Sequence, residues 1–389
     1  MTSTPKGALR IFIVAGETSG DILGARLMQA LRVLHPNVEF QGVGGEAMRA
    51  QGLVSQFPMS DIAVMGLVPV IKRLPMLLER IRQTALMCEL SRPDALVIID
   101  SPDFTHRVAR RVRKAAPDIP IVNYVSPTVW AWREGRAARM RAYIDHVMAV
   151  LPFEPAAHAR LGGPPCTYVG HPLVERLDVL RPNAAEQSVR DTKRRILVLP
   201  GSRVSEVTRL LPVFGETAAR IRAAVPQAEF VLPVAPHVAD RVAAGVAGWA
   251  VRPELVRGEE DKHAAFRAAR AALAASGTVT LELGLSQIPM VTAYRVSRIE
   301  QRIVQALVKV STPILPSLIL GRRIVPEFLQ EAANPDTLTR AILPLIEGGR
   351  ERDAQLQDFQ ALDRAMQVAG GSPSMAAARI VAGYAARAA

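Results

Sequence analysis

The sequence has few cysteines and few aromatic residues, and it lacks a long uninterrupted apolar run. Its two cysteines, Cys88 and Cys166, stand far apart without CxxC spacing, which argues for a reducing compartment and against a disulfide framework. Aromatic residues make up 5% of the chain, so aliphatic side chains must dominate the core.

The apolar stretches are too short to predict a membrane span. One of the most apolar, residues 314–320, is interrupted by proline and falls short of the ~20 residues that cross a bilayer. The N-terminus shows no basic region, long apolar segment or cleavage site of an export signal. We therefore expect a protein that is soluble or peripheral to a membrane.

Positive charge and length are what the chain has in excess. Lys+Arg 48 against Asp+Glu 36 give a formal net charge of +12, which favours an anionic partner: nucleic acid, anionic lipid or a phosphorylated substrate. Hydrophobic residues at 49% and charged residues at 22% are typical of a folded globular protein. A chain of 389 residues is too long for one ordinary core, so two α/β lobes are expected.

The first lobe opens on a strand, a turn and a helix within residues 11–32. An apolar run, 11–14, gives way to a loop of small and polar residues, 15–21, that leads into a helix with apolar positions near 3.6 spacing. Gly16 and Gly20 let backbone approach a ligand, and a helix start at Asp21 would aim free N–H groups at it. A tight turn capped by Asp21 explains the same pattern equally well.

Residues 62–82 form an apolar segment with basic neighbours. Prolines interrupt it, and its surface is apolar all round. Such a segment is either a buried helix or a patch that dips into a bilayer interface. On the residues alone, burial is favoured.

Two further strands of this lobe end in candidate site residues. The buried run 95–99 ends at Asp100, where a catalytic base would be useful, although Asp100 could also be a cap; Asp103 suits the N-cap of the next helix. The strand 121–125 leads to Trp130, Trp132 and Arg133. Such a cluster can line a sugar or acyl site, or simply pack under a loop.

The second lobe repeats the pattern with a stronger anion signal. The strand 196–199 is followed by Gly201, Ser202 and Arg203 and then by a helix, so a glycine, a hydroxyl, a helix N-terminus and an arginine converge. The strand 271–275 leads into Ser276, Gly277 and Thr278, with Glu282 one turn into the following helix. A diphosphate and a ribose diol would use all of these groups, while a capping sequence is the simpler alternative. Together the two loops favour nucleotide binding.

These elements predict an α/β protein of two Rossmann-like lobes. We expect a first lobe at 1–172, a linker at 173–194 where strand character is lost, and a second lobe at 195–364. The C-terminal helix, about 365–389, has few partners of its own, and we expect it to pack back on the first lobe.

An ordered set of motifs resembles the lipid-A-disaccharide synthase family of bacterial glycosyltransferases. The blocks are AGETSGDILGA (15–25), AVMGLV (63–68), IDSPDF (99–104), VSPTVWAWR (125–133), LPFE (151–154), LPGSR (199–203) and ASGTVTLE (275–282). They cover both lobes. The resemblance implies the GT-B architecture, with two Rossmann-like lobes and a ligand cleft between them.

The resemblance also implies a reaction. UDP-2,3-diacylglucosamine and 2,3-diacylglucosamine 1-phosphate would condense, with inversion, to a β-1,6-linked disaccharide 1-phosphate and UDP. Asp100 is then the candidate base or acceptor-orienting residue, with Glu17 as its rival. Arg203 would neutralise the leaving group with Gly201 and Ser202. The remaining predicted substrate contacts are Ser19, Gly20 and Asp21 toward the acceptor side, Trp130 and Arg133 in the tryptophan loop, and Ser276, Gly277, Thr278 and Glu282 around UDP.

At Ser317 the chain departs from the family pattern, which tends to have asparagine in a Leu-Pro-Asn segment. If that side chain contacts a substrate, the shorter hydroxyl fills the role or the role has moved. The sequence contains no Asp-x-Asp motif and no HxxxH or similar ligand set, which agrees with metal-independent chemistry without a cofactor.

Acylated substrates change the interpretation of residues 65–78 within the apolar segment 62–82. These residues become an expected dock on an anionic membrane, which places the protein in the cytoplasm, peripheral to the inner face of the inner membrane. A homodimer is left open. The expected membrane contacts are Met65, Leu67, Val68, Val70, Ile71, Leu74, Leu77 and Leu78.

Two alternative functions come from different classes. One is another GT-B UDP-sugar transferase or a UDP-sugar epimerase, against which the GETSGD and VWAWR blocks speak. The other is a nucleic-acid-binding protein, supported by charge alone, because the chain lacks a recognition helix, zinc knuckles and an aromatic-basic RNP strand. We therefore expect no nucleic-acid partner.

Overall fold

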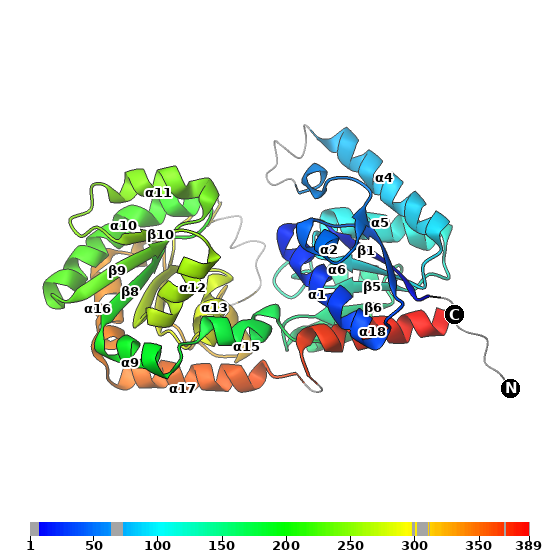
Figure 1. Ribbon diagram of the computed structural model, residues 1–389. Coiled ribbons are helices and arrows are strands. Elements are labelled where there is room, and N and C mark those ends of the chain that lie inside the picture. Colours follow the sequence, from blue (N-terminus) through cyan, green and yellow to red (C-terminus); the bar gives the residue numbers. More distant parts are fainter. Residues whose placement is uncertain are drawn as a thin grey trace. The chain divides into compact units, whose positions relative to one another are not determined.

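The computed structural model describes residues 8–63, 73–297, 300–301, 310, 312–368 and 371–388. The chain divides into two compact units, one formed by Met1–Pro172 with Val368–Ala389 and the other by Leu173–Gln367. Each unit is a parallel β-sheet flanked by helices (Figure 1). The predicted α/β class is therefore confirmed.

The first unit is built on a parallel sheet with the strand order β3-β2-β1-β4-β5-β6-β7. Its strands are β1 (Arg10–Ala15), β2 (Glu39–Val43), β3 (Val54–Ser55), β4 (Ala95–Ile99), β5 (Ile121–Tyr124), β6 (His146–Ala149) and β7 (Cys166–Tyr168). All five residues of β4 are buried, as expected for an apolar run in a sheet covered on both faces.

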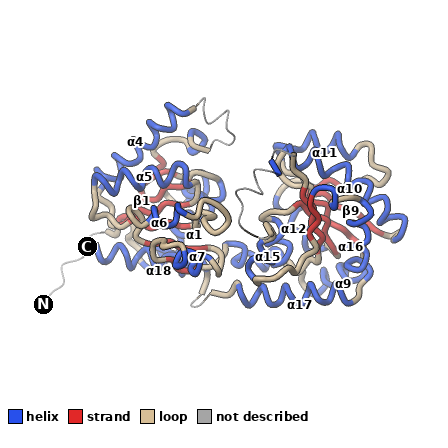
Figure 2. The backbone as a smooth tube through the Cα atoms, turned by 180° about the vertical axis from the view of Figure 1, so that it is seen from behind, coloured by secondary structure: helices blue, strands red, loops and turns tan. Residues whose placement is uncertain are grey.

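Helices cover both faces of this sheet. They are α1 (Thr18–Leu34), α2 (Glu46–Ala50), α4 (Leu74–Ser91), α5 (Pro102–Ala115), α6 (Gly135–Met140), α7 (Glu154–Arg160) and α18 (Pro373–Ala388), with a 3₁₀ turn η1 (Met59–Asp61). Side chains of α4 and α5 share one core with Phe12 and Val14 of β1. The C-terminal helix α18 belongs to this unit and packs along α1 on the other side of the sheet (Figures 1 and 2).

The second unit is built on a parallel sheet with the order β10-β9-β8-β11-β12-β13. Its strands are β8 (Arg194–Leu199), β9 (Ala228–Pro233), β10 (Glu254–Val256), β11 (Ala271–Ala275), β12 (Met290–Tyr294) and β13 (Glu327–Leu329). Aliphatic residues dominate its two cores, as the low aromatic content predicts.

One of these cores joins the sheet to α10, α11 and α16, and the other joins it to α12, α13 and α17. The helices are α8 (Leu177–Leu180), α9 (Ala184–Thr192), α10 (Val204–Ala224), α11 (Ala239–Val246), α12 (Glu259–Ala268), α13 (Val279–Leu285), α15 (Leu315–Ile319), α16 (Pro335–Glu347) and α17 (Arg350–Ala365). Short 3₁₀ turns are η2 (Pro172–Arg176), η3 (Pro236–Val238) and η4 (Gln330–Ala332).

Residues 173–194, predicted as a linker, are largely helical and are grouped with the second unit. Asn183 and Glu186 form a capping box at the start of α9, which satisfies two backbone N–H groups. Arg190 on that helix is 2% exposed. Its guanidinium donates to the backbone carbonyls of Phe266, Arg267, Ser286 and Gln287 at 2.8–3.3 Å. The segment is therefore anchored to the second unit.

Candidate functional site

Each sheet has a point at which its strand order reverses. It lies between β1 and β4 in the first unit and between β8 and β11 in the second. In open parallel sheets, ligands bind beyond the carboxyl ends of the strands at such a switch point. The loops that leave these four strands contain all three predicted catalytic residues, Glu17, Asp100 and Arg203.

In the first unit the switch point brings Glu17 and the Asp100 loop together. Ala15 of β1 is paired with Ile99 of β4, so the loops that follow lie side by side. The Ser101 hydroxyl donates to Glu17 Oε1 at 3.1 Å, and the Ser101 N–H donates to Asp100 Oδ1 at 2.8 Å. Ser101 therefore donates a hydrogen bond to each of the two carboxylates.

The backbone of this loop is unusual. Asp100 has φ +50° and Ser101 has φ +43°, a left-handed conformation that costs non-glycine residues of order 1 kcal/mol or more. The Thr105 hydroxyl donates to the Asp100 carbonyl at 2.6 Å, which helps to hold the turn. A Cβ on Gly16 would lie 2.6 Å from the Ser101 Cβ, so the β1 loop needs glycine there. Strain of this kind is characteristic of functional sites.

The other predicted residues of the opening loop have different surroundings. Ser19 is exposed, whereas Gly20 is buried. Helix α1 begins at Thr18 with Glu17 as its N-cap residue, so Asp21 does not cap this helix as expected. Its carboxylate is 3% exposed and accepts the backbone N–H groups of Gly45, Ala47 and Met48 at 2.7–3.1 Å. Asp21 thus caps the distant helix α2.

The loop after β5 places Trp130 and Arg133 at the same edge of the sheet. The Trp130 indole N–H donates to Glu154 Oε1 at 3.1 Å, and the Arg133 guanidinium lies 4.2 Å from the centroid of the Trp132 ring. Arg133 and Trp132 are exposed, and Trp130 is half-buried. The loop thus combines stacked aromatic and cationic groups, which suits contact with an anionic or glycosyl ligand.

Sequence reasoning gave no role to Glu154, which lies under this loop at the start of α7. It is 2% exposed, and its second oxygen accepts the backbone N–H groups of Val150 and Leu151 at 3.2 and 3.0 Å. Burial raises the pKa of Glu154 to about 7, against the effect of its hydrogen bonds. The LPFE block was the only sequence signal for this residue.

In the second unit the loop after β8 combines a glycine of positive φ with an exposed arginine. Gly201 has φ +101°, a conformation that favours glycine. The Arg203 side chain is 76% exposed and pairs with Glu206 at 3.3 Å, and its residue is the N-cap of α10. His237 Nε2 lies 2.7 Å from the Ser202 carbonyl oxygen. His237 and Glu206 are neighbours that sequence reasoning did not identify.

The loop after β11 lies beside the loop after β8, because Leu199 of β8 is paired with Ala274 of β11. Gly277 has φ +152°, and Thr278 is the N-cap residue of α13. Glu282 is paired with Lys262 of α12, whose Nζ lies 2.8 and 3.0 Å from its two oxygens. Ser276 lies beside Glu327 of β13. Burial raises the pKa of Glu327, against the effect of the hydrogen bond that it accepts from the Thr312 hydroxyl at 3.0 Å. Lys262 and Glu327 were not predicted.

Ser317, at the position where the family pattern has asparagine, is 2% exposed. Its hydroxyl accepts the backbone N–H of Ile324 at 3.2 Å. In this chain the serine therefore stabilises the turn after α15.

Of residues 65–78, the predicted membrane segment, the structure describes 73–78. Met65, Leu67, Val68, Val70 and Ile71 lie outside the described residues. On α4, Leu74 is 44% and Leu78 41% exposed, whereas Leu77 packs against the core of the first unit. Leu77 is therefore partly buried, in the direction of the alternative that the residues alone favoured. Among the described residues, no helix has the length and apolar character needed to span a membrane.

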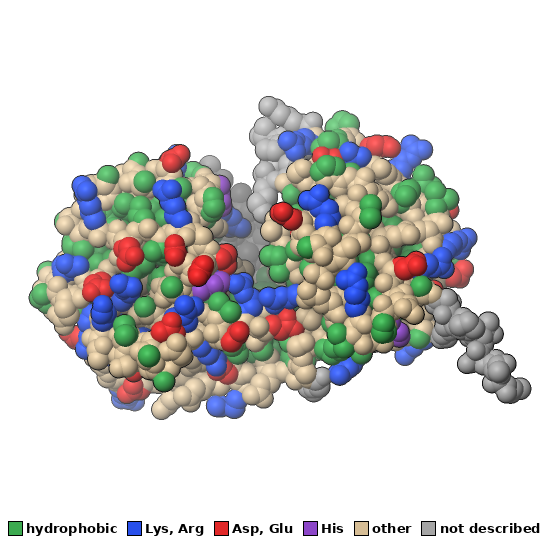
Figure 3. Space-filling view, viewed as in Figure 1, with side chains coloured by type: hydrophobic (Ala, Val, Ile, Leu, Met, Phe, Trp, Pro, Cys, Tyr) green, Lys and Arg blue, Asp and Glu red, His purple; other side chains and the backbone are tan. Residues whose placement is uncertain are grey.

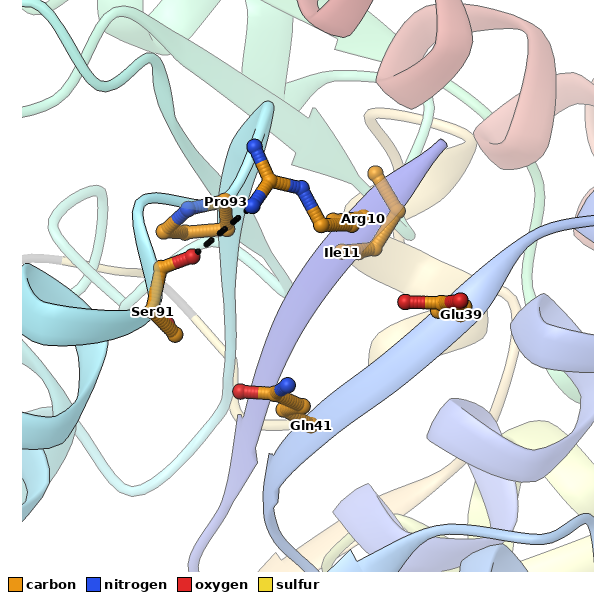
Figure 4. Close-up of a pocket in the computed structure, with 6 residues that line it drawn as sticks. All are labelled: Arg10, Ile11, Glu39, Gln41, Ser91 and Pro93. Atoms are coloured by element: carbon orange, nitrogen blue, oxygen red, sulfur yellow. Dashed lines mark hydrogen bonds between the residues drawn. The ribbon is translucent and has the colours of Figure 1, made fainter. Parts of the chain in front are cut away.

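Two pockets of the first unit lie at the opposite, amino edge of the sheet. The smaller, about 10 Å³, is lined by Arg10, Glu39 and Ser91 among others (Figure 4). The larger, about 660 Å³, lies between the end of α1 and α18. Neither is lined by a predicted site residue. Across the described part of the chain, no group of three His, Cys, Asp or Glu residues could hold a metal ion.

Charge does not gather in one patch on the visible surface. On the face shown in Figure 3, Lys and Arg side chains are interspersed with Asp and Glu over each unit. On this face the net positive charge therefore does not mark a binding surface, and the switch-point residues are the better guide to it.

Comparison with known proteins points to one family. The model of the family described as lipid-A-disaccharide synthetase matches residues 11–379. A protein of Nitrobacter winogradskyi named lipid-A-disaccharide synthase is 53% identical, with 96% of this chain and 94% of that protein covered. One of the same name from Rhodopseudomonas palustris is 52% identical, with 97% of each chain covered.

Solved structures with a similar fold are much more distant in sequence. A glycotransferase of kitacinnamycin has a TM-score of 0.63 at 18% identity and covers 97% of this chain and 99% of its own. A UDP-GlcNAc 2-epimerase from Neisseria meningitidis, solved with UDP-GlcNAc, has a TM-score of 0.62 at 12% identity and covers 97% and 100%. At these identities the likeness shows the fold alone.

Proposed function

Because the chain belongs to the lipid-A-disaccharide synthetase family, we propose that its two units divide one glycosyl transfer between them. The chain is a glycosyltransferase of lipid A disaccharide synthesis that uses a UDP-sugar donor and a glycolipid acceptor. The proposal assigns the acceptor chemistry to the first unit and UDP binding to the second. The observation that carries it is that carboxylates flank one switch point and an arginine with left-handed glycines flanks the other.

The reaction joins UDP-2,3-diacylglucosamine to the 6-hydroxyl of 2,3-diacylglucosamine 1-phosphate. The hydroxyl oxygen attacks the anomeric carbon and loses its proton to a base, and the bond between that carbon and UDP breaks. Attack from the face opposite the α-linked leaving group gives the β-1,6 product. The protein must therefore supply a base and positive or N–H stabilisation for the departing diphosphate.

The first unit supplies the base. Asp100 is our candidate for proton removal or acceptor orientation, and Glu17 is the rival. Ser101 donates a hydrogen bond to each of them, at 2.8 and 3.1 Å. These bonds fix the orientation of both carboxylates, so both stay candidates for the base. Ser19, in the first turn of α1, and Trp130 and Arg133, in the loop after β5, lie at the same edge of the sheet and would contact the acceptor or the reacting sugar. The buried Asp21 contributes by holding α2 beside this loop.

The second unit binds UDP. Arg203 would exchange its surface pair with Glu206 for the diphosphate, with Ser202 and the first N–H groups of α10 beside it. Ser276, Gly277 and Thr278 would line the adjacent loop. Glu282, held by Lys262 at 2.8 Å, would accept hydrogen bonds from the ribose diol.

The family assignment is tested by an assay that follows UDP release and disaccharide formation together. With acylated donor and acceptor we expect one disaccharide for each UDP released. Turnover of unacylated UDP-GlcNAc, with no reaction of the acylated donor, would instead indicate another GT-B transferase or an epimerase.

We also propose that the protein binds the cytoplasmic face of the inner membrane through α4 and the segment before it. Leu74 and Leu78 are one turn apart and exposed, and Leu86 and Leu90 continue the same i, i+4 row with 50% and 69% exposure. Arg73, Arg82 and Arg92 flank or interrupt this row. An apolar row with basic neighbours suits an anionic lipid surface.

Cosedimentation with vesicles tests this dock. We expect binding to phosphatidylglycerol vesicles but not to phosphatidylcholine vesicles, and loss of binding in Leu74→Glu and Leu78→Glu. Val54→Glu is the matched control, because Val54 is 83% exposed on β3 of the same unit. Equal binding of all three variants would exclude α4 as the dock.

A further inference from the structure

Two residues of helix α7, one turn apart, form hydrogen bonds to the loop after β5. Glu154 accepts the Trp130 indole N–H at 3.1 Å, and His158 Nε2 lies 2.8 Å from the Ser126 hydroxyl oxygen. Ser126, Glu154 and His158 are at most 4% exposed. Because all three are buried, their contacts serve the loop itself.

The geometry points to Glu154 as a positioning residue that fixes the ring of Trp130 for contact with the substrate. This inference rests on the proposed role of Trp130 in substrate binding. The ring is held in two ways. Its N–H is bound by the carboxylate, and it packs against the Phe153 ring in a T-shaped arrangement, with ring centroids 5.0 Å apart and ring planes at 87°. A half-buried tryptophan fixed in this manner presents one defined surface.

The number of hydrogen-bond donors around Glu154 explains why a carboxylate is needed there. Three N–H groups point at it, from Trp130, Val150 and Leu151. A carboxylate has two acceptor oxygens and no donor, whereas glutamine has one acceptor and an NH₂ group. In Glu154→Gln one of the three N–H groups must therefore face another donor, and a buried donor without a partner is costly.

The rest of the loop is fixed independently of Glu154. Ser126 is bound to His158, and the Trp132 indole N–H donates to the Thr128 hydroxyl at 2.9 Å. Val125 and Arg133, at the ends of the loop, have φ +73° and +54°. Removal of the Glu154 contact should therefore release the Trp130 ring without unfolding the loop.

Kinetics and tryptophan fluorescence of Glu154→Gln test the inference. We expect KM for donor or acceptor to rise about tenfold, the effect of one hydrogen bond, with kcat changed less. The emission that Trp130 contributes, measured as the difference from Trp130→Phe, should shift. In the Trp130→Phe background the same Gln substitution should add less than a twofold change, because the amide no longer meets an indole N–H.

Glu134→Gln is the matched control. Glu134 pairs with Arg160 of α7 at 3.9 Å, so this variant removes a carboxylate that contacts the same helix, and we expect wild-type KM and emission. If Glu154→Gln does not fold, Glu154→Asp keeps the charge but shortens its reach to the indole, and the same measurements apply.

The outcomes separate this inference from the proposed function. A lower melting temperature with unchanged KM and unchanged Trp130 emission would overturn the inference, because Glu154 would then be only structural. A second outcome is shifted emission in Glu154→Gln together with wild-type kinetics in both Glu154→Gln and Trp130→Phe. Glu154 would then still fix the ring, but Trp130 would have no part in substrate binding.

Discussion

The two units place opposite chemistry at equivalent points of the same topology. In the first, the switch point between β1 and β4 carries Glu17 and Asp100. In the second, the switch point between β8 and β11 carries Arg203 and hydroxyl residues. The fold provides a place for a ligand in each, and the side chains decide which ligand it is.

The backbone conformations of the two switch-point loops also differ. In the loops at the switch points, positive φ angles fall on Gly201 and Gly277 in the second unit and on Asp100 and Ser101 in the first. Glycines leave room for a phosphate to approach the backbone. Left-handed non-glycine residues cost stability, and we infer that the first unit tolerates this cost because the side chains themselves are needed. The comparison therefore predicts that variants of the two loops fail in different ways.

The largest effect is expected from Asp100→Asn. Loss of a general base typically lowers kcat by about 10²- to 10⁴-fold, and Asn keeps the size of the side chain, so the fold should persist. Steady-state kinetics of Asp100→Asn and Glu17→Gln, with circular dichroism as a control for folding, measure it. If Glu17→Gln shows the larger loss, the base is Glu17; near-wild-type rates in both would remove the first switch point from the mechanism.

Arg203→Ala should lower kcat by about 10²- to 10³-fold, as loss of one group that stabilises developing charge does. Unlike the Asp100 variant, it should also weaken donor binding. Arg220→Ala is the matched control and should be neutral, because Arg220 also forms a surface ion pair, with Asp336, but lies near the other end of α10. Equal effects of the two arginine variants would contradict a specific role for Arg203.

The buried Glu154 adds a pH dependence that belongs to the first unit. Its pKa is raised from 4.5 to about 7 in the folded chain, so the fold binds this proton more tightly than the unfolded chain. The resulting stabilisation is present at low pH and is lost as pH rises from about 4.5 to about 7, with a free-energy change of about 3 kcal/mol.

Urea unfolding of wild type and Glu154→Gln at pH 5 and pH 8 measures this contribution. We expect the stability advantage of the wild type over the variant to shrink toward pH 8, because glutamine does not titrate. A difference that is the same at both pH values would show that the carboxyl group does not titrate in this range.

Glu282→Gln should give the smallest change. Its hydrogen bond to the ribose and its pair with Lys262 are partial contributions to donor binding, so we expect KM for the donor to rise about tenfold with little change in kcat. Initial rates at varied donor concentration measure it. A fall in kcat at unchanged KM would place Glu282 in the chemical step instead.

Much of this comparison was predictable from the sequence, because it depends on local patterns. Buried runs such as 95–99 indicate parallel strands, and polar loops at their ends indicate a ligand site. The two lobes repeat this pattern, so Asp100 and Arg203 could be identified as candidates before the fold was known.

The remaining features depend on contacts between distant segments. Asp21 reads as a cap of its own helix, but its three N–H partners lie 24–27 residues away. The segment 173–194 was predicted as a linker because it is polar and has no strand character. Its polar Arg190 is nevertheless buried, because backbone carbonyls accept hydrogen bonds from its guanidinium. Leu77 differs from Leu74 and Leu78 only in its direction on α4, and no sequence pattern revealed that Lys262 holds Glu282.

The division of labour between the units is tested most directly by UDP binding to Asp100→Asn and Arg203→Ala, measured by calorimetry. If UDP belongs to the second unit, Asp100→Asn binds it with wild-type Kd, and Arg203→Ala binds it at least about tenfold more weakly, as expected for loss of a charge-assisted contact. Weaker binding in Asp100→Asn with wild-type binding in Arg203→Ala would contradict the account.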